Sequence, residues 1–399
     1  MNLYKNILKT LILAPYLFAF SGMLIIPNGD KKMAIFLVVG SLASLCFAKI
    51  NKISLKERLL NPYLIIIILA TFYSIFSYYT HGASSREMRA LIATAIFLAV
   101  FPFKKISSNL LIAILLLGSL ILFINSFYYH HLLGQGRLSG YINPIPYATI
   151  CALIGSVAYS LMLSSSSVKE KWICSLPLLI IIYPLIISES RGVWIALIIS
   201  IIVVSFTYVK SKGITLNKMI ILLTSFSIIS IGSLFLFKDN IEFTIKKTQQ
   251  EINQMESGVF DNSIGLRFKM WLIAPKLIEK NMLLGSGDSH QLEIKKLYDK
   301  GEVSYSLYNF NPTHYHNQFL DKLIKSGIIG LVILISLMAY PIKISNKLSE
   351  RGKTIIFGVT SLIFIASLSD VPLNHPQPLI LYFLLLFPIC SRCKRVTND

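Results

Sequence analysis

Apolar runs of membrane-spanning length recur along almost the whole chain, separated by short polar stretches. A helix that crosses the hydrocarbon core of a bilayer needs about 20 mostly apolar residues, and the pattern predicts twelve such spans. They lie near residues 10–27, 33–48, 60–79, 88–103, 109–128, 145–164, 172–188, 192–209, 219–237, 327–342, 354–372 and 378–390. One long segment, 238–326, interrupts the series. We therefore predict an all-α polytopic membrane protein with one large loop outside the bilayer.

The organisation of the chain follows from these spans. The first run is preceded by Lys5 and Lys9, as in a secretory signal peptide, but no small-residue cleavage site follows Ile26 before the next span. We interpret it as the first transmembrane helix. The predicted parts are transmembrane helices 1–9 in residues 1–237, an outer loop with short helices in 238–326, and helices 10–12 with a C-terminal tail in 327–399.

The composition indicates that most of the protein surface faces lipid, and the distribution of charge predicts the orientation of the chain in the membrane. The chain is 54% hydrophobic and 14% charged, with a net charge of +19. Placing the N-terminus in the cytoplasm puts 20 lysines and arginines in the inside loops and six in the short outside loops. Those six are Lys31, Lys32, Arg86, Arg89, Arg137 and Arg191. This asymmetry predicts that both termini are cytoplasmic. It also makes the basic charge a topology signal, so we expect the bilayer and no nucleic acid as a partner.

The cysteines give no sign of a metal site or a disulfide framework. Five are scattered through or beside the spans, and only Cys390 and Cys393 form a Cys-x-x-Cys pair, without a second pair or a nearby histidine. We interpret them as free thiols facing a reducing compartment.

The outer loop contains a predicted helix and a histidine-rich turn. Leu266, Met270, Ile273 and Leu277 recur at helical spacing, with Pro275 expected to kink the helix. Arg267 and Trp271 are four residues apart and therefore share one face. Farther along, His314 and His316 precede an apolar stripe that runs into the tenth span, so His316 is expected near the start of a helix that enters the membrane from outside.

Arginines at the outer surface are the strongest indication of a binding site. Arg191 interrupts a long apolar hairpin at its outer tip, where a charge costs several kcal/mol unless it is paired or faces water. One reading is a structural ion pair between Glu189 and Arg191, and the other is a functional cation. Arg137, in a glycine-rich outer turn, is a second interfacial arginine with the same two readings.

The predicted location of several such residues on the same side of the membrane favours the functional reading. Arg191, Arg267, His316 and Arg137 come from distant parts of the chain, yet all are predicted on the outer side. Arginine binds phosphate through a planar fork of donors and stays charged. A histidine titrates near neutral pH and is suited to removing a proton from a hydroxyl. Together these groups match the transfer of a sugar from a lipid diphosphate, with cations on the leaving group and a base on the acceptor.

A metal is not required by this set. Many enzymes that transfer sugars hold the diphosphate with a cation on an Asp-x-Asp pair, and the chain has none outside the membrane. His314 and His316 are two residues apart, and the sequence offers no obvious third ligand. We therefore expect no metal and no other cofactor.

At these residues the chain resembles a known family. Glu189-Ser190-Arg191-Gly192-Val193-Trp194, Gly265-Leu266-Arg267-Phe268, and His316-Asn317 followed nine residues later by Gly327 are similar to the motifs of bacterial O-antigen ligases. That superfamily also includes O-antigen polymerases and some protein O-oligosaccharyltransferases. The resemblance covers nearly the whole chain, and no single motif separates ligase from polymerase.

The resemblance implies a reaction, a fold and site residues. Such ligases move an O-polysaccharide from undecaprenyl diphosphate to lipid A–core on the periplasmic face of the inner membrane, without metal or nucleotide, and their fold is of the GT-C type. Arg191 and Arg267 would hold the diphosphate and His316 would activate the acceptor hydroxyl. Asp370 falls where the ligases carry an important acidic residue; its alternative is a helix-end cap. Supporting candidates are Arg137, Glu189, Trp271, His314, Asn317 and Asp370.

Two other functions stay open at this point. A polymerase of the same superfamily would use the same donor but a second lipid-linked repeat as acceptor. A transporter is also compatible with twelve spans, although transporters keep their polar sites near the bilayer midplane and often have repeated halves. Here the informative cations are predicted at the outer edge, and only the second half has a large loop.

Overall fold

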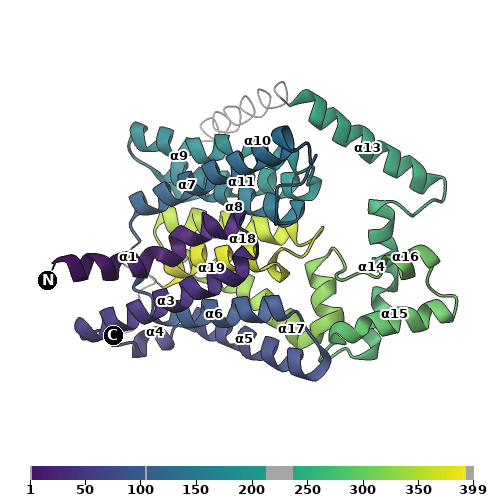
Figure 1. Cartoon of the computed structure of the whole chain (residues 1–399), viewed down its shortest axis with the longest axis horizontal. Coiled ribbons are helices and arrows are strands. Elements are labelled where there is room, and N and C mark those ends of the chain that lie inside the picture. Colours follow the sequence, from purple (N-terminus) through teal and green to yellow (C-terminus); the bar gives the residue numbers. More distant parts are fainter. Residues whose placement is uncertain (1, 104–105, 213–236, 392–399) are drawn as a thin grey trace.

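The computed structural model describes residues 2–103, 106–212 and 237–391, and within these ranges it contains helices and no strand. Figure 1 shows the helices lying side by side, with one group projecting at the end opposite the start of the chain. They are α1 (Asn2–Ala19), α2 (Gly22–Ile25), α3 (Gly29–Ile50), α4 (Lys56–Leu59), α5 (Pro62–His81), α6 (Ser85–Val100), α7 (Ser108–Phe127), α8 (Pro144–Ser164), α9 (Val168–Ile180), α10 (Ile182–Ile187), α11 (Arg191–Lys212), α13 (Lys238–Glu256), α14 (Ser263–Lys280), α15 (His290–Asp299), α16 (Tyr305–Phe310), α17 (Gln318–Ile344), α18 (Glu350–Ala366) and α19 (Pro376–Cys390). Short 3-10 or π turns also occur: η2 (Tyr128–Leu132), η3 (Gly287–Ser289), η4 (Ser345–Lys347) and η5 (Pro372–Asn374).

The membrane-spanning character predicted from the sequence is confirmed. Among the described residues, eight helical segments are long and apolar enough to cross a bilayer. They are Asn6–Ile25, Gly29–Ile50, Pro62–His81, Ser108–Leu132, Pro144–Ser164, Val168–Ile187, Arg191–Lys212 and Gln318–Lys347. The protein is therefore an all-α, multi-pass membrane protein.

The number of full-length spans differs from the twelve expected. Three expected spans form shorter helices, α6, α18 and α19, of 16, 17 and 15 residues. Pro102 lies two residues after the end of α6, and α18 is followed by the polar turn Ser367–Asp370, so neither apolar run is helical over its whole length. The expected span 219–237 falls almost wholly on residues 213–236, outside the described part.

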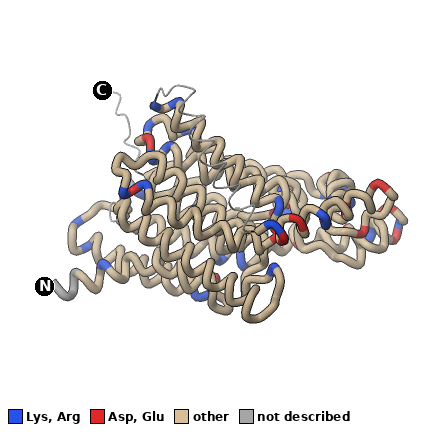
Figure 2. The backbone as a smooth tube through the Cα atoms, turned by 90° about the horizontal axis from the view of Figure 1, so that it is seen from above, with Lys and Arg blue, Asp and Glu red and all other residues tan. Residues whose placement is uncertain are grey.

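Charge is distributed as a membrane protein requires. Figure 2 shows lysines, arginines and acidic residues gathered toward the two ends of the helices, with a tan zone between them. A charged side chain in the hydrocarbon core costs several kcal/mol, which explains this segregation. The projecting group α13–α16 lies at one of the charged ends (Figures 1 and 2). We refer to that end as the outer end.

The centre of the bundle is α8, which is buried over 89% of its apolar window. It packs against α9, α11 and α18, and α11 also packs along α18. Hydrogen bonds between these helices connect the Ser156 and Ser200 hydroxyls at 2.7 Å, and the Ser200 hydroxyl with the Gly358 carbonyl at 2.9 Å. Small hydroxyl residues let helices approach closely inside lipid. This contact fixes where the outer ends of α11 and α18 emerge.

The outer segment has a small core of its own. Met270, Ile273, Ala274 and Leu277 of α14 pack with apolar residues of α15, α16 and α17. The predicted helix at 266–278 is therefore confirmed, with its apolar positions facing inward. The side chain of Tyr315 is completely buried in this core, which anchors the turn that contains the two histidines.

α17 is broken near its start at Gly327. The residue has φ 60° and ψ −166°, a conformation that only glycine adopts readily. A Cβ at this position would also overlap the backbone carbonyl of Leu283, while the amide of Ile328 donates to the Met282 carbonyl at 2.9 Å. Gly327 thus lets the outer segment dock directly on the α17 backbone.

Replacing Gly327 with alanine tests this docking. We expect Gly327→Ala to lose about 3 kcal/mol or more of stability, because backbone strain and a steric overlap act together. Gly301→Ala is the matched control: Gly301 also has positive φ, but no described atom lies within 4 Å of the added Cβ. It should lose only about 1 kcal/mol. Thermal unfolding of the two variants in detergent measures the difference, and equal midpoints would contradict the role of Gly327.

Candidate active site

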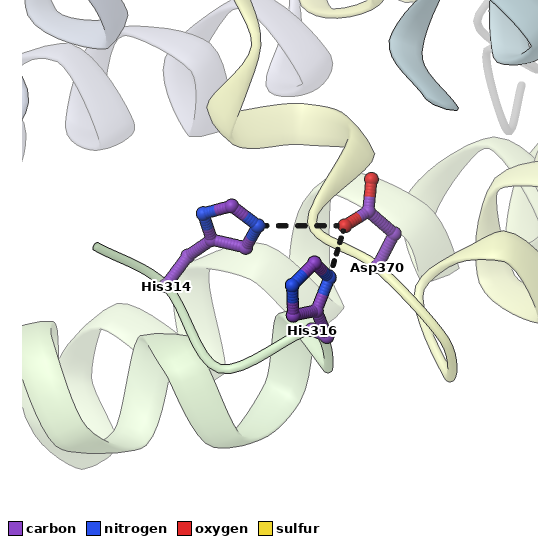
Figure 3. A group of neighbouring side chains, drawn as sticks. All are labelled: His314, His316 and Asp370. Atoms are coloured by element: carbon purple, nitrogen blue, oxygen red, sulfur yellow. Dashed lines mark hydrogen bonds and ion pairs between the residues drawn. The ribbon is translucent and has the colours of Figure 1, made fainter. Parts of the chain in front are cut away.

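The structure joins His316 to Asp370 at the outer end of the bundle. His316 Nδ1 lies 3.0 Å from Asp370 Oδ1, and His314 Nε2 lies 3.7 Å from the same oxygen. Figure 3 shows both imidazole rings, carried by one loop, turned toward the carboxylate, which comes from a separate segment. The Asp370 side chain is 4% exposed and that of His316 is 17% exposed. The carboxylate is therefore enclosed, whereas the His316 ring keeps access to solvent.

Backbone contacts hold these two segments together. Asn317 caps α17 by accepting hydrogen bonds from the amides of Phe319 and Leu320, both at 3.1 Å. The next amide, of Gln318, donates to the Ser367 carbonyl at 2.8 Å, just past the end of α18. His316 itself has φ 47°, a conformation that is uncommon for a residue with a side chain. The start of α17 and the end of α18 thus form one connected unit.

Trp271 and Tyr315 position the histidine loop from the other side. The Trp271 indole donates to the Tyr315 carbonyl at 2.8 Å, and the Tyr315 hydroxyl lies 2.8 Å from His290 Nδ1. Because Tyr315 is buried in the outer core, the residue after it is directed toward the bundle. Trp271 therefore supports the loop that carries His316.

Arg267 meets the same turn. Its Nη1 donates to the carbonyl of Ser369, the residue before Asp370, at 3.1 Å. Arg267 Nε and Asp370 Oδ2 are buried and have no hydrogen-bond partner among the described residues. Unpaired buried donors and acceptors are rare in folded proteins. These two atoms therefore stay unsatisfied within the described part of the chain.

Arg191 lies beside the same turn, because the next residue, Gly192, contacts Ser369. It is the first residue of α11, and a Cβ on Gly192 would overlap the Ser369 hydroxyl, so the helix start and the turn lie in direct contact. The expected Glu189–Arg191 pair is not formed. Arg191 instead donates to Thr248 at 2.7 Å and to Glu251 at 3.0 Å, both on α13.

The different pairing follows from local geometry. Glu189 has φ 51° and lies in the turn before α11, where its carboxylate approaches Lys247 at 3.5 Å. Thr248 and Glu251 are three residues apart on α13 and so share one face of that helix. Glu251 is not among the residues predicted from the sequence, because only the fold brings this face of α13 to Arg191.

Arg137 lies near the other arginines. The pKa of its guanidinium is lowered, mainly by burial. The charge of Glu189 opposes this shift, and the charge of Arg191 adds to it. Burial likewise lowers the pKa of Arg267, with Asp370 opposing the shift and with Arg191 and Arg137 adding to it. These mutual effects place three cations in one electrostatic environment. Contacts place Arg267, His316 and, through Gly192, Arg191 at the turn that contains Asp370, whereas Arg137 is related to them through its charge. An open cavity around these residues stays a prediction.

Burial and hydrogen bonds set the protonation of the site. Burial by itself raises the pKa of Asp370, but the hydrogen bond from His316 and the nearby His375, His314 and His316 lower it below its usual value overall. Asp370 is therefore ionised at neutral pH. Burial, together with His316, lowers the pKa of His314 to about 4, so this imidazole is neutral there.

His314, His316 and Asp370 also form a group with the composition of a metal site. One ligand atom from each lies within 4.8 Å of the others. The expectation that the two histidines lack a third ligand is therefore wrong: Asp370, 54 residues after His316, supplies it through the fold. A metal on His316 Nδ1 would replace the hydrogen bond to Asp370, so the two roles exclude each other.

Comparison with known proteins agrees with the resemblance read from the motifs. Residues 176–335 match a family model described as O-antigen ligase. The match supports a member of the O-antigen ligase/polymerase superfamily. The matched segment contains Arg191, Arg267 and His316 but ends before Asp370. The carboxylate that contacts His316 therefore lies outside the part of the chain that the family comparison covers.

A second comparison gives a distant relative. An uncharacterized protein of Haemophilus influenzae is 27% identical over 245 residues, which cover 57% of this chain and 59% of that protein. The alignment thus spans somewhat more than half of the relative. The name of the relative states no activity.

The buried histidines predict a stability that depends on pH. Burial lowers the pKa of both His290 and His314 to about 4, against about 6.5 in an unfolded chain. Between these values the unfolded state binds more protons, so stability should fall as the pH is lowered from about 6.5 to about 4. Thermal unfolding midpoints across this range measure the effect. His290→Asn keeps an acceptor near Tyr315 but cannot titrate, and it should weaken the dependence; an unchanged slope would contradict the assignment to His290.

Proposed function

We propose that the protein is a membrane glycosyltransferase that moves an O-polysaccharide from undecaprenyl diphosphate to lipid A–core at the periplasmic face of the inner membrane. The observation that carries the proposal is the His316–Asp370 hydrogen bond, with Arg267 bonded to the adjacent Ser369 and Arg191 beside it. A base and cations suited to a diphosphate meet at one turn. The superfamily match supports the same class of reaction.

His316 is the proposed base. Its Nδ1 faces an ionised carboxylate, so this nitrogen carries the proton and Nε2 has the free lone pair. The acceptor hydroxyl gives its proton to Nε2 as its oxygen bonds to the anomeric carbon of the donor. The bond from that carbon to the diphosphate breaks, and the leaving group takes the electron pair. Attack opposite the leaving group inverts the anomeric configuration.

The arginines stabilise the leaving diphosphate. Preorganised cations aimed at a developing charge contribute most of the rate in many enzymes. The buried Nε of Arg267 has no partner among the described residues, and Arg191 lies at the N-terminus of α11, where backbone amides also favour anions. Arg137 adds a third positive charge to the same region. No paired carboxylates for a divalent cation are needed in this arrangement.

A polymerase would use the same donor and the same base with another acceptor. The difference lies in the acceptor alone, because a polymerase extends a lipid-linked repeat. Transport is disfavoured because Arg191 bonds to α13 and Arg267 and His316 belong to the outer segment, whereas transporter sites lie near the bilayer midplane.

Variants of the arginines test binding of the diphosphate. We expect Arg191→Ala and Arg267→Ala each to lower the rate about 100-fold or more, as the loss of one oxyanion donor does. Arg267→Lys should restore little, because the planar fork is lost. The measurement is transfer by purified protein in nanodiscs.

Glu251→Gln is the matched control for Arg191. It removes the ion pair to α13 but leaves the guanidinium in place. It should retain most of the activity if Arg191 binds the donor. A loss as large as that of Arg191→Ala would show that the ion pair only maintains the structure.

Complementation tests the reaction itself. A ligase-null Gram-negative strain carrying this gene should regain long O-polysaccharide chains on lipid A–core, seen as a ladder on gels, and His316→Ala should abolish the ladder despite normal expression. Restoration of a polymerase-null strain instead would assign the polymerase function. With purified protein, retained activity after chelation supports the Asp370–His316 base, whereas loss that Zn²⁺ or Mn²⁺ reverses would favour the metal arrangement.

A further inference from the structure

A second group of cations lies on the other flank of the candidate active site. Lys31 of α3 and Arg86 and Arg89 of α6 line a hollow of about 570 Å³, part of it open to solvent, between α3, α6 and the start of α19. Asp30 also lines it and pairs with Arg86 at 3.0 Å. Three cations and one anion leave the hollow with a net charge of +2.

The hollow combines this charge with an apolar floor. Leu37 lies almost two helical turns beyond Lys31 along α3, and Ile380 lies one turn beyond Pro376 along α19, so both are deeper in the bundle than the cations. The starts of α3, α6 and α19 meet here, and their backbone amides add positive potential. A charged rim above an apolar floor has the chemistry of a site for an anionic lipid.

The distribution of basic residues gives independent support. The predicted short outside loops hold six lysines and arginines against 20 in the inside loops, and the remaining twelve lie at the ends of, or within, the long outer segment 238–326. Two of the six, Arg137 and Arg191, belong to the group proposed to hold the donor, which we call the donor flank. The other four lie at or near the starts of α3 and α6 and form the second flank: Lys31, Lys32, Arg86 and Arg89. The cations of the short outside loops therefore fall into these two groups, which simple membrane anchoring does not require.

The hollow adjoins the site through His375. Pro376 lines the hollow, and the preceding residue, His375, has its ring centroid 6.2 Å from that of His314. A neighbouring hollow of about 600 Å³ between α5, α6 and α17, part of it also open to solvent, lacks this charge, because its Glu87 and Lys322 pair at 2.6 Å. Of these two hollows, only the one lined by Lys31, Arg86 and Arg89 combines excess positive charge with a position next to the histidines at 314, 316 and 375.

We propose that Lys31, Arg86 and Arg89 bind the phosphate groups of the membrane-anchored acceptor and hold its sugar beside His316. This rests on the function proposed above. Donor and acceptor are both anchored in the outer leaflet, so two lipids must reach one base from different sides. The arginines at 137, 191 and 267 serve the donor diphosphate, and the second flank serves the acceptor.

Binding and kinetics together test the proposal. The variant Lys31→Gln/Arg89→Gln removes two cations for which no ion pair is seen among the described residues, and leaves the Arg86–Asp30 pair intact. In nanodiscs it should bind phosphorylated lipid A–core about tenfold more weakly. Its KM for that acceptor should rise similarly, with kcat and the KM for the donor unchanged. Lys295→Gln/Lys300→Gln, two exposed lysines of the outer segment that do not line the hollow, is the charge-matched control and should behave as wild type.

Further arms identify the acceptor and separate the two proposals. Dephosphorylated lipid A–core should bind wild type as weakly as the phosphorylated form binds the variant. If the variant instead weakens only a prenyl-diphosphate-linked repeat, the flank still binds the acceptor, and the acceptor is that of a polymerase. Equal binding by variant, control and wild type, or a rise in donor KM, would overturn the acceptor site. Absence of transfer by wild type would refute the proposed function while the binding result still decides on the phosphate site.

Discussion

The close packing of α11 against α18 is the constraint on which the candidate site depends. Hydroxyl groups and a small residue bring the helices together inside the bilayer, through Ser200 and Gly358. At the outer end the same contact continues as Gly192 against Ser369. Arg191 and Asp370 are the neighbours of these two residues in sequence, so the packing that joins the helices also sets the place of a cation and a carboxylate.

Much of the fold and part of the site could be predicted from the sequence. Hydrophobic length identified the membrane helices, because lipid imposes the length and composition of a span. The helix with Arg267 and Trp271 on one face was also predictable, because helical periodicity is local. The motif residues were found as chemically suitable groups, and their catalytic roles stay predictions.

The rest depended on contacts between distant segments. Nothing near Arg191 in sequence indicates that its partner is Glu251, 60 residues later on α13. The third group beside His314 and His316 is Asp370, which only the fold brings to them. The short helices α6 and α18 differ from the expected spans because hydropathy does not show where a polar turn ends an apolar run, as Ser367–Asp370 does.

α14 has a further consequence for the arrangement of the site. Its Arg267 bonds to the turn before Asp370, and its Trp271 bonds to the residue before His316. Four residues along a helix correspond to a rise of about 6 Å. One helix therefore fixes the distance between the turn that contains Asp370 and the loop that contains His316. The separation between the Asp370 turn and the His316 loop is thus set by helical geometry and does not depend on the substrate that the site binds.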